Sequence, residues 1–167
     1  MIALLAALLL GTASAAGRLA PEEAFAAGQS EYAAERMPTA ECKNLKGARC
    51  GGFSFKSKKP AETDSRGRKT WLRFSLVVTE HPSEAAAAAD FAKLAKELGD
   101  PQLDPYSKAP EYWRLSGKKV YGLYGACLFA GKRWRAMIKA LDAELGAPTD
   151  ATVAQCGCGT GCWAGVR

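Results

Sequence analysis

Two pairs of segments in this chain alternate apolar and polar residues, which is the pattern of half-buried β-strands. The first pair, residues 52–58 and 69–79, flanks a stretch of turn-forming and charged residues, as in a long hairpin. The second pair, residues 112–115 and 119–129, flanks a short glycine-containing turn. Glycines in this second pair favour bulges, so one long bent strand is the alternative there. The most regular apolar face is formed by Leu72, Phe74, Leu76 and Val78.

A helical period of apolar residues follows each pair of strands. After the first pair, the segment His81-Pro82-Ser83-Glu84 begins a helix and Gly99 ends it. A further short amphipathic helix is expected over residues 21–36, where Phe25 and Tyr32 lie seven residues apart. The expected buried stripes of the two later helices are Phe91, Leu94, Ala95 and Leu98, and Trp134, Met137, Ile138, Leu141 and Leu145.

Two hairpin–helix units in tandem predict an α+β fold. We expect a single four-stranded antiparallel sheet with the helices packed on one face, which leaves the other face available for contact. The sequence divides accordingly into a signal peptide (1–15), an N-terminal helical segment (16–41), the α+β domain (42–146) and a tail rich in cysteine and glycine (147–167). The tail has few large apolar residues, so crosslinks are expected to hold it against the domain.

Residues 1–15 have the features of a cleavable secretion signal. An apolar run covers residues 1–10, and Ala13-Ser14-Ala15 fits the small-x-small rule for cleavage. The run is shorter than the about 20 apolar residues that span a bilayer, and no later stretch is apolar enough to do so. We therefore expect a secreted or periplasmic protein whose signal is cleaved near Ala15.

The six cysteines predict three disulfides, because an even number in an exported chain is typical of a disulfide framework. Proximity favours a bond between Cys42 and Cys50. We expect Cys127 to join one tail cysteine and the other two tail cysteines to pair together. The alternative is a Zn²⁺ or Cu⁺ site, but no second cysteine pair has zinc-ligand spacing. The tail cysteines are Cys156, Cys158 and Cys162.

Known catalytic motifs are not found in the sequence. The single histidine, His81, precedes a proline, and the sequence has no Gly-x-Ser-x-Gly segment that would supply a serine nucleophile. A position at the start of a helix therefore explains His81 better than a catalytic role. No phosphate-binding loop, dinucleotide motif or zinc-protease motif occurs, and no cofactor is expected. Paired carboxylates distant in the sequence remain the one catalytic alternative, that of a small exported hydrolase.

The net charge of +6 is concentrated in two blocks. Residues 42–73 carry ten basic and two acidic side chains, and residues 113–145 carry seven and two. Such blocks are usual on solvated surfaces, and lysines such as Lys56, Lys58 and Lys59 also protect sheet edges from aggregation. Basic residues interleaved with aromatics also form interfaces for acidic partners. The residues predicted for such a face are Trp71, Arg73, Trp113 and Arg114.

These patterns lead to a hypothesis of an exported, disulfide-stabilised binding module. Its partner would be an acidic protein or an anionic polymer of the bacterial cell envelope, because the expected location argues against nucleic acid. The exported hydrolase is the first alternative, and a purely structural envelope protein is the second. The identity of the ligand is not encoded in any motif.

Overall fold

The computed structural model describes residues 19–99, 110–125, 132–146, 151–157 and 161–166. The predicted signal peptide and the residues Cys127 and Cys158 lie outside these ranges. The described chain forms an α+β fold with a mostly antiparallel sheet. Its three helices are α1 (Pro21–Gly28), α2 (Glu84–Gly99) and α3 (Lys132–Leu145). None of these helices is long and apolar enough to cross a membrane.

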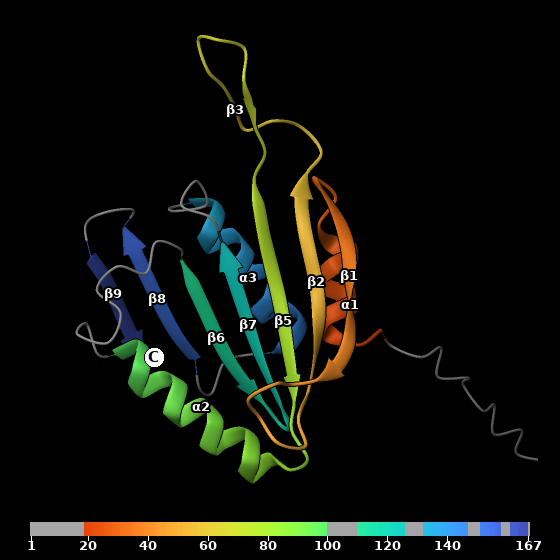
Figure 1. Cartoon of the computed structure of the whole chain (residues 1–167), viewed down its shortest axis with the longest axis vertical. Helices are drawn as coiled ribbons and strands as arrows, with labels where there is room; N and C mark the ends of the chain where they lie inside the picture. The colour runs from red at the N-terminus through yellow and green to blue at the C-terminus, as the bar shows by residue number, and fades with distance from the viewer. Residues whose placement is uncertain (1–18, 100–109, 126–131, 147–150, 158–160, 167) are drawn as a thin grey trace, which may run out of the picture.

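The central sheet contains the four predicted strands and three that the sequence did not predict (Figure 1). The predicted strands are β2 (Arg49–Ser57), β5 (Arg73–Glu80), β6 (Glu111–Ser116) and β7 (Lys119–Gly125). The additional strands are β1 (Tyr32–Glu41), β8 (Ala151–Gly157) and β9 (Gly161–Val166). The strand order is β1-β2-β5-β7-β6-β8-β9, with antiparallel pairing throughout. The second hairpin is therefore two strands rather than one bent strand.

The N-terminal segment is only partly helical, which corrects the expectation of a helix over residues 21–36. Helix α1 ends at Gly28, and from Tyr32 the chain pairs with β2 as the edge strand of the sheet. Pro38 is tolerated there because an edge strand needs only one set of ladder hydrogen bonds. The register shifts between Met37 and Ala40, at the position of this proline.

The helices lie on both faces of the sheet, not on one face as predicted (Figure 1). Successive side chains of a strand point to opposite faces. In β6 and β7, Tyr112 and Leu123 belong to the core beneath α1 and α3, whereas Trp113 and Val120 pack with α2. Both sets of side chains in these strands are therefore covered. We call the two faces the α1/α3 side and the α2 side.

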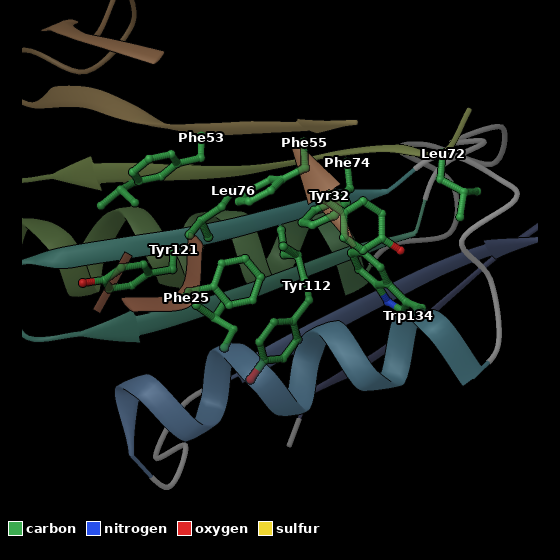
Figure 2. Close-up of a cluster of buried hydrophobic side chains, with 13 residues drawn as sticks. Phe25, Tyr32, Phe53, Phe55, Leu72, Phe74, Leu76, Tyr112, Tyr121 and Trp134 are labelled. Carbon is green, nitrogen blue, oxygen red and sulfur yellow. The ribbon is translucent and has the colours of Figure 1, made fainter. Parts of the chain in front are cut away.

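The main core lies on the α1/α3 side and is rich in aromatic rings (Figure 2). Phe55 of β2 stacks on Phe74 of β5 with ring centroids 4.3 Å apart and planes 4° apart. Phe25 of α1 meets both rings edge-on, and Trp134 of α3 is fully buried. Such ring pairs each add about 0.5–1.5 kcal/mol beyond the area they bury.

A polar contact fixes α1 at the other end of this core. Glu22 accepts a hydrogen bond from Lys119 Nζ on β7 at 2.8 Å, and the hydroxyl of Tyr121 lies 3.4 Å from its second oxygen. Burial by itself raises the pKa of Glu22, but the hydrogen bond and charge of Lys119 outweigh it and hold the pKa below 4.5. The ionised carboxylate therefore stabilises the fold.

We expect this contact to make stability depend on pH in the acid range. A carboxylate whose pKa is depressed on folding stabilises above its unfolded pKa, and the contribution is lost as pH falls below about 4.5 through the folded value. Glu22→Gln should lower the free energy of unfolding by about 1 kcal/mol at pH 7, with the difference from wild type shrinking toward pH 3. Urea unfolding at several pH values measures this. Glu23→Gln, which removes the exposed ion pair with Arg36, is the matched control and should change little.

The predicted disulfide between Cys42 and Cys50 is present. It closes the loop between β1 and β2, and the backbone N–H of Cys42 also donates to the carbonyl of Ala48 at 2.9 Å. The chain-entropy relation gives about 2.5 kcal/mol for a loop of this length. This bond thus secures the edge strand to its neighbour.

The tail forms a strand pair, β8–β9, that extends the sheet beyond β6. Backbone pairing therefore holds the tail in addition to any crosslink. Cys156 and Cys162 are directly opposite each other in the register. Opposed Cα atoms in antiparallel strands are about 4.5–5.5 Å apart, within the range that a disulfide spans.

This register sharpens the predicted pairing of the tail. We expect Cys156 to bond Cys162, which leaves Cys158 for Cys127. In a Cys156→Ser variant, alkylation before reduction should then label Cys162, and in Cys158→Ser it should label Cys127. Peptide mass analysis identifies the labelled residue. Labelling of Cys127 in the Cys156→Ser variant would show the opposite pairing.

Candidate functional site

A group of basic and aromatic side chains is exposed on the α2 side of the sheet, over β2 and β5. Lys56 and Arg73 are register partners on these strands, and both are exposed. Trp71 precedes β5 and retains 37% of its accessible surface, which is unusual for a large aromatic residue in this fold. The Lys56 ammonium lies 4.9 Å from the centre of the Trp71 ring. We call Lys56, Trp71 and Arg73 the basic–aromatic patch.

Strand alternation explains why these residues are at the surface. Their neighbours Phe55, Leu72 and Phe74 are buried in the main core on the opposite side. The sheet surface beside the patch is polar, because Ser54 and Ser75 are also register partners. Helix α2 packs against β6, β7, β8 and β9 rather than over this part of the sheet (Figure 1). Cations over an aromatic ring at exposed sites gain about 0.5–1 kcal/mol, so the patch is held in place weakly and can exchange this contact for a ligand.

A two-stranded finger next to the patch adds positive charge. It consists of β3 (Glu62–Thr63) and β4 (Lys69–Thr70) and projects beyond the end of the central sheet (Figure 1). At its tip, Asp64 accepts hydrogen bonds from the backbone amides of residues 66 and 68 and from the Arg68 side chain. The Arg68 amide and guanidinium, with the other amide, hold the pKa of Asp64 below its usual value. From residue 56 to residue 73 the chain carries seven basic and two acidic side chains.

Trp113 lies on the same side of the sheet but away from the patch. Its ring covers Gly122, where an added Cβ would come within 2.5 Å of the indole, and it meets Tyr124 edge-on at 4.9 Å. Its Nε1 donates to Glu111 at 2.9 Å, and it packs with the α2 cluster. Trp113 pairs with Gly122 of β7, which in turn pairs with Val77 of β5. Val77 lies four residues, about 13 Å along the strand, from Arg73. Trp113 therefore serves mainly to pack α2 onto the sheet.

Arg114 is not part of an exposed face, which corrects the sequence-based prediction. Its side chain is 3% exposed and points to the α1/α3 side, where it forms an ion pair with Asp142 of α3 at 2.8 Å. It also donates to the carbonyl oxygens of Leu145 and Gly146 at the end of α3. Tyr112 donates to the same carboxylate at 2.5 Å, and burial together with Asp142 raises its pKa far above the usual value. Arg114 thus caps the C-terminus of α3 and joins it to β6.

We expect substitution of Arg114 to reduce stability and substitution of Arg73 to have little effect on it, because Arg114 is buried and Arg73 is exposed. Arg114→Ala leaves Asp142 without its cation, and breaking a buried pair costs about 3 kcal/mol of unfolding free energy. Arg73→Ala should change this free energy by less than about 0.5 kcal/mol, as is usual for surface positions. Urea unfolding of both variants compares them. Equal stability of the two variants would contradict this assignment.

His81 is at the junction of β5 and α2, as the sequence predicted, and it is buried. Its backbone N–H donates to the carbonyl of Lys118, and its Nε2 lies 3.3 Å from an oxygen of Asp90 on α2. Two residues later, Ser83 caps the helix by accepting a hydrogen bond from the Ala86 amide at 3.1 Å. Only 4% of the His81 side chain is exposed, and its contact with Asp90 lies between the end of β5 and α2.

Three described carboxylates are engaged by other side chains of the fold. Glu22 is bound by Lys119, Asp90 faces His81, and Asp142 is shared by Arg114 and Tyr112. Within the described chain, no three histidine, cysteine or acidic side chains are grouped as metal ligands.

Lys56 is the patch residue that sequence reasoning did not select. The alternation of residues 52–58 placed it opposite the two phenylalanines, but its position beside Trp71 depends on the pairing of β2 with β5. Comparisons with protein-family models, curated proteins and solved structures gave no match. The geometry of the described residues is therefore the basis for the function proposed below.

Proposed function

We propose that this protein is an exported binding module that holds an acidic protein or an anionic polymer of the cell envelope on its basic–aromatic patch. The observation that carries the proposal is the exposed Trp71 ring with Lys56 against it and Arg73 beside it. A large aromatic surface flanked by cations is typical of anchor positions in interfaces. Trp113 and Arg114 have structural roles in this proposal, Trp113 in packing α2 onto the sheet and Arg114 in capping α3.

The electrostatics of this end of the molecule favour an anionic partner. The finger and the adjoining strands carry the excess of basic side chains, and the finger's own Asp64 is occupied by Arg68. Clustered charge of one sign raises the rate at which an oppositely charged partner arrives. Because these side chains are exposed, salt should weaken the attraction strongly.

The Cys42–Cys50 disulfide supports the exported location, since disulfides persist mainly in oxidising compartments. A rigid sheet braced by a disulfide is suited to presenting fixed side chains to a partner. The secretion signal and a periplasmic or secreted location belong to this proposal as sequence-based expectations.

Two probes test the proposal and separate its two partner classes. Poly-L-glutamate represents an acidic polypeptide, and alginate represents an acidic polysaccharide. We expect wild-type protein to bind at least one of them at low ionic strength, with affinity falling as salt is added. Trp71→Ala and Arg73→Gln should each weaken binding about tenfold, measured by fluorescence anisotropy with labelled polymer.

Lys93→Gln is the matched control, because Lys93 is a surface cation on α2 that is 76% exposed and whose described ion-pair partner is Glu97. It removes the same charge away from the patch and should leave affinity nearly unchanged. If Lys93→Gln weakens binding as much as Arg73→Gln, attraction depends on net charge alone and the patch is not the site. Failure of both polymers to bind wild type would reject the proposal.

A further inference from the structure

A cavity of about 390 Å³ opens at the finger end of the sheet, on the α1/α3 side. Its lining residues come from the start of β1, the end of β2, the base of the finger and the start of α3. Tyr32, Pro60 and Leu72 give it apolar walls. Its volume falls within the roughly 300–1,000 Å³ typical of pockets for small molecules.

Three cations surround this cavity. Lys58 and Lys59 follow β2, and Arg133 is in the first turn of α3, while Glu31 is the one acidic side chain among the described lining residues. No described carboxylate forms an ion pair with any of the three. Helix α3 also presents its N-terminal end here, where the helix dipole favours negative charge.

Arg133 and Tyr32 line the same cavity. Burial raises the pKa of the Tyr32 phenol, the neighbouring Glu31 raises it further, and Arg133 acts in the opposite direction. As a lining residue, Arg133 is placed to meet a group inside the cavity. Its neighbour Trp134 is fully buried, which fixes the start of α3 relative to the sheet.

Hydrogen bonds between the lining segments hold the rim of the cavity. The Ser57 amide donates to the Leu72 carbonyl at 2.9 Å, and the Leu72 amide donates to the Ser57 hydroxyl oxygen at 3.0 Å. The amide of Lys58 donates to the carbonyl of Glu31 at 2.9 Å. A preorganised pocket loses little entropy on binding.

We propose that this cavity is a binding site for a small organic anion, a molecule with a compact apolar body and one acidic group. The apolar body would lie against Tyr32 and Leu72, and the acidic group would face Arg133 and Lys58. Arginine is suited to this role because its planar guanidinium can donate two parallel hydrogen bonds to a carboxylate, sulfonate or phosphate.

This site is separate from the basic–aromatic patch. Leu72 points into the core side of the sheet, whereas Trp71 and Arg73 on either side of it belong to the α2 side. The cavity and the patch therefore lie back to back at one end of the sheet. The two proposals can fail independently.

The probe that tests the cavity is 8-anilinonaphthalene-1-sulfonate, a fluorescent molecule with aromatic rings and one sulfonate. N-phenyl-1-naphthylamine has the same rings without the acidic group and serves as the uncharged comparison. With the folded, oxidised full chain, we expect one saturable sulfonate site. Arg133→Gln should weaken it by about tenfold or more, as loss of a charge-assisted hydrogen bond does, and Lys58→Gln should weaken it in the same direction.

Arg135→Gln is the matched control, because Arg135 is an exposed arginine on the same helix that does not line the cavity. It should leave sulfonate binding unchanged, and the uncharged compound should bind wild type and Arg133→Gln equally. Circular dichroism melting curves establish that each variant is folded. Equal sulfonate affinity of the Arg133 and Arg135 variants would overturn the proposal. So would loss of binding in Trp71→Ala, which would assign the signal to the patch instead.

Discussion

The alternation of side chains along the strands is the constraint on which the rest of this structure depends. A strand that is covered on one side can expose the other, whereas a strand covered on both sides buries both sets of its side chains. Strands β6 and β7 are of the second kind, between α3 and α2. Strands β2 and β5 are of the first kind, and their uncovered side carries Lys56, Arg73 and the paired serines.

The aromatic core holds the strands and helix α1 in fixed positions relative to one another. The stacked rings of Phe55 and Phe74 join β2 to β5, and Phe25 brings α1 onto both strands. On the other side of the same strands, the residues between and beside these phenylalanines are held at fixed positions. The orientation of the patch is thus a consequence of packing that takes place on the opposite face.

Buried and exposed charged groups also have different places in this fold. Buried or half-buried ionic groups, such as Arg114 with Asp142 and Glu22 with Lys119, join helices to strands. At the finger end, Lys58, Lys59 and Arg133 have no ion-pair partner among the described residues. Several cations that form no described ion pair therefore lie at the end of the sheet where both the patch and the cavity are found.

The sequence by itself determined the features that arise from local patterns. Period-two alternation located β2, β5, β6 and β7, and the helical stripes located α2 and α3, because these patterns reflect burial of one face within a single segment. The short interval between Cys42 and Cys50 was sufficient to predict their bond.

Only the tertiary structure decided which face each residue meets. Strand β1 becomes a strand because β2 is beside it, and its own residues, mostly exposed, carry little apolar signal. In β6, large side chains occur at Tyr112, Trp113 and Leu115 alike, so the pattern could not show that Arg114 points inward to the end of α3. The placement of α2 opposite α1 and α3, and of Lys56 beside Trp71, depends on contacts between residues distant in the chain, which no local period encodes.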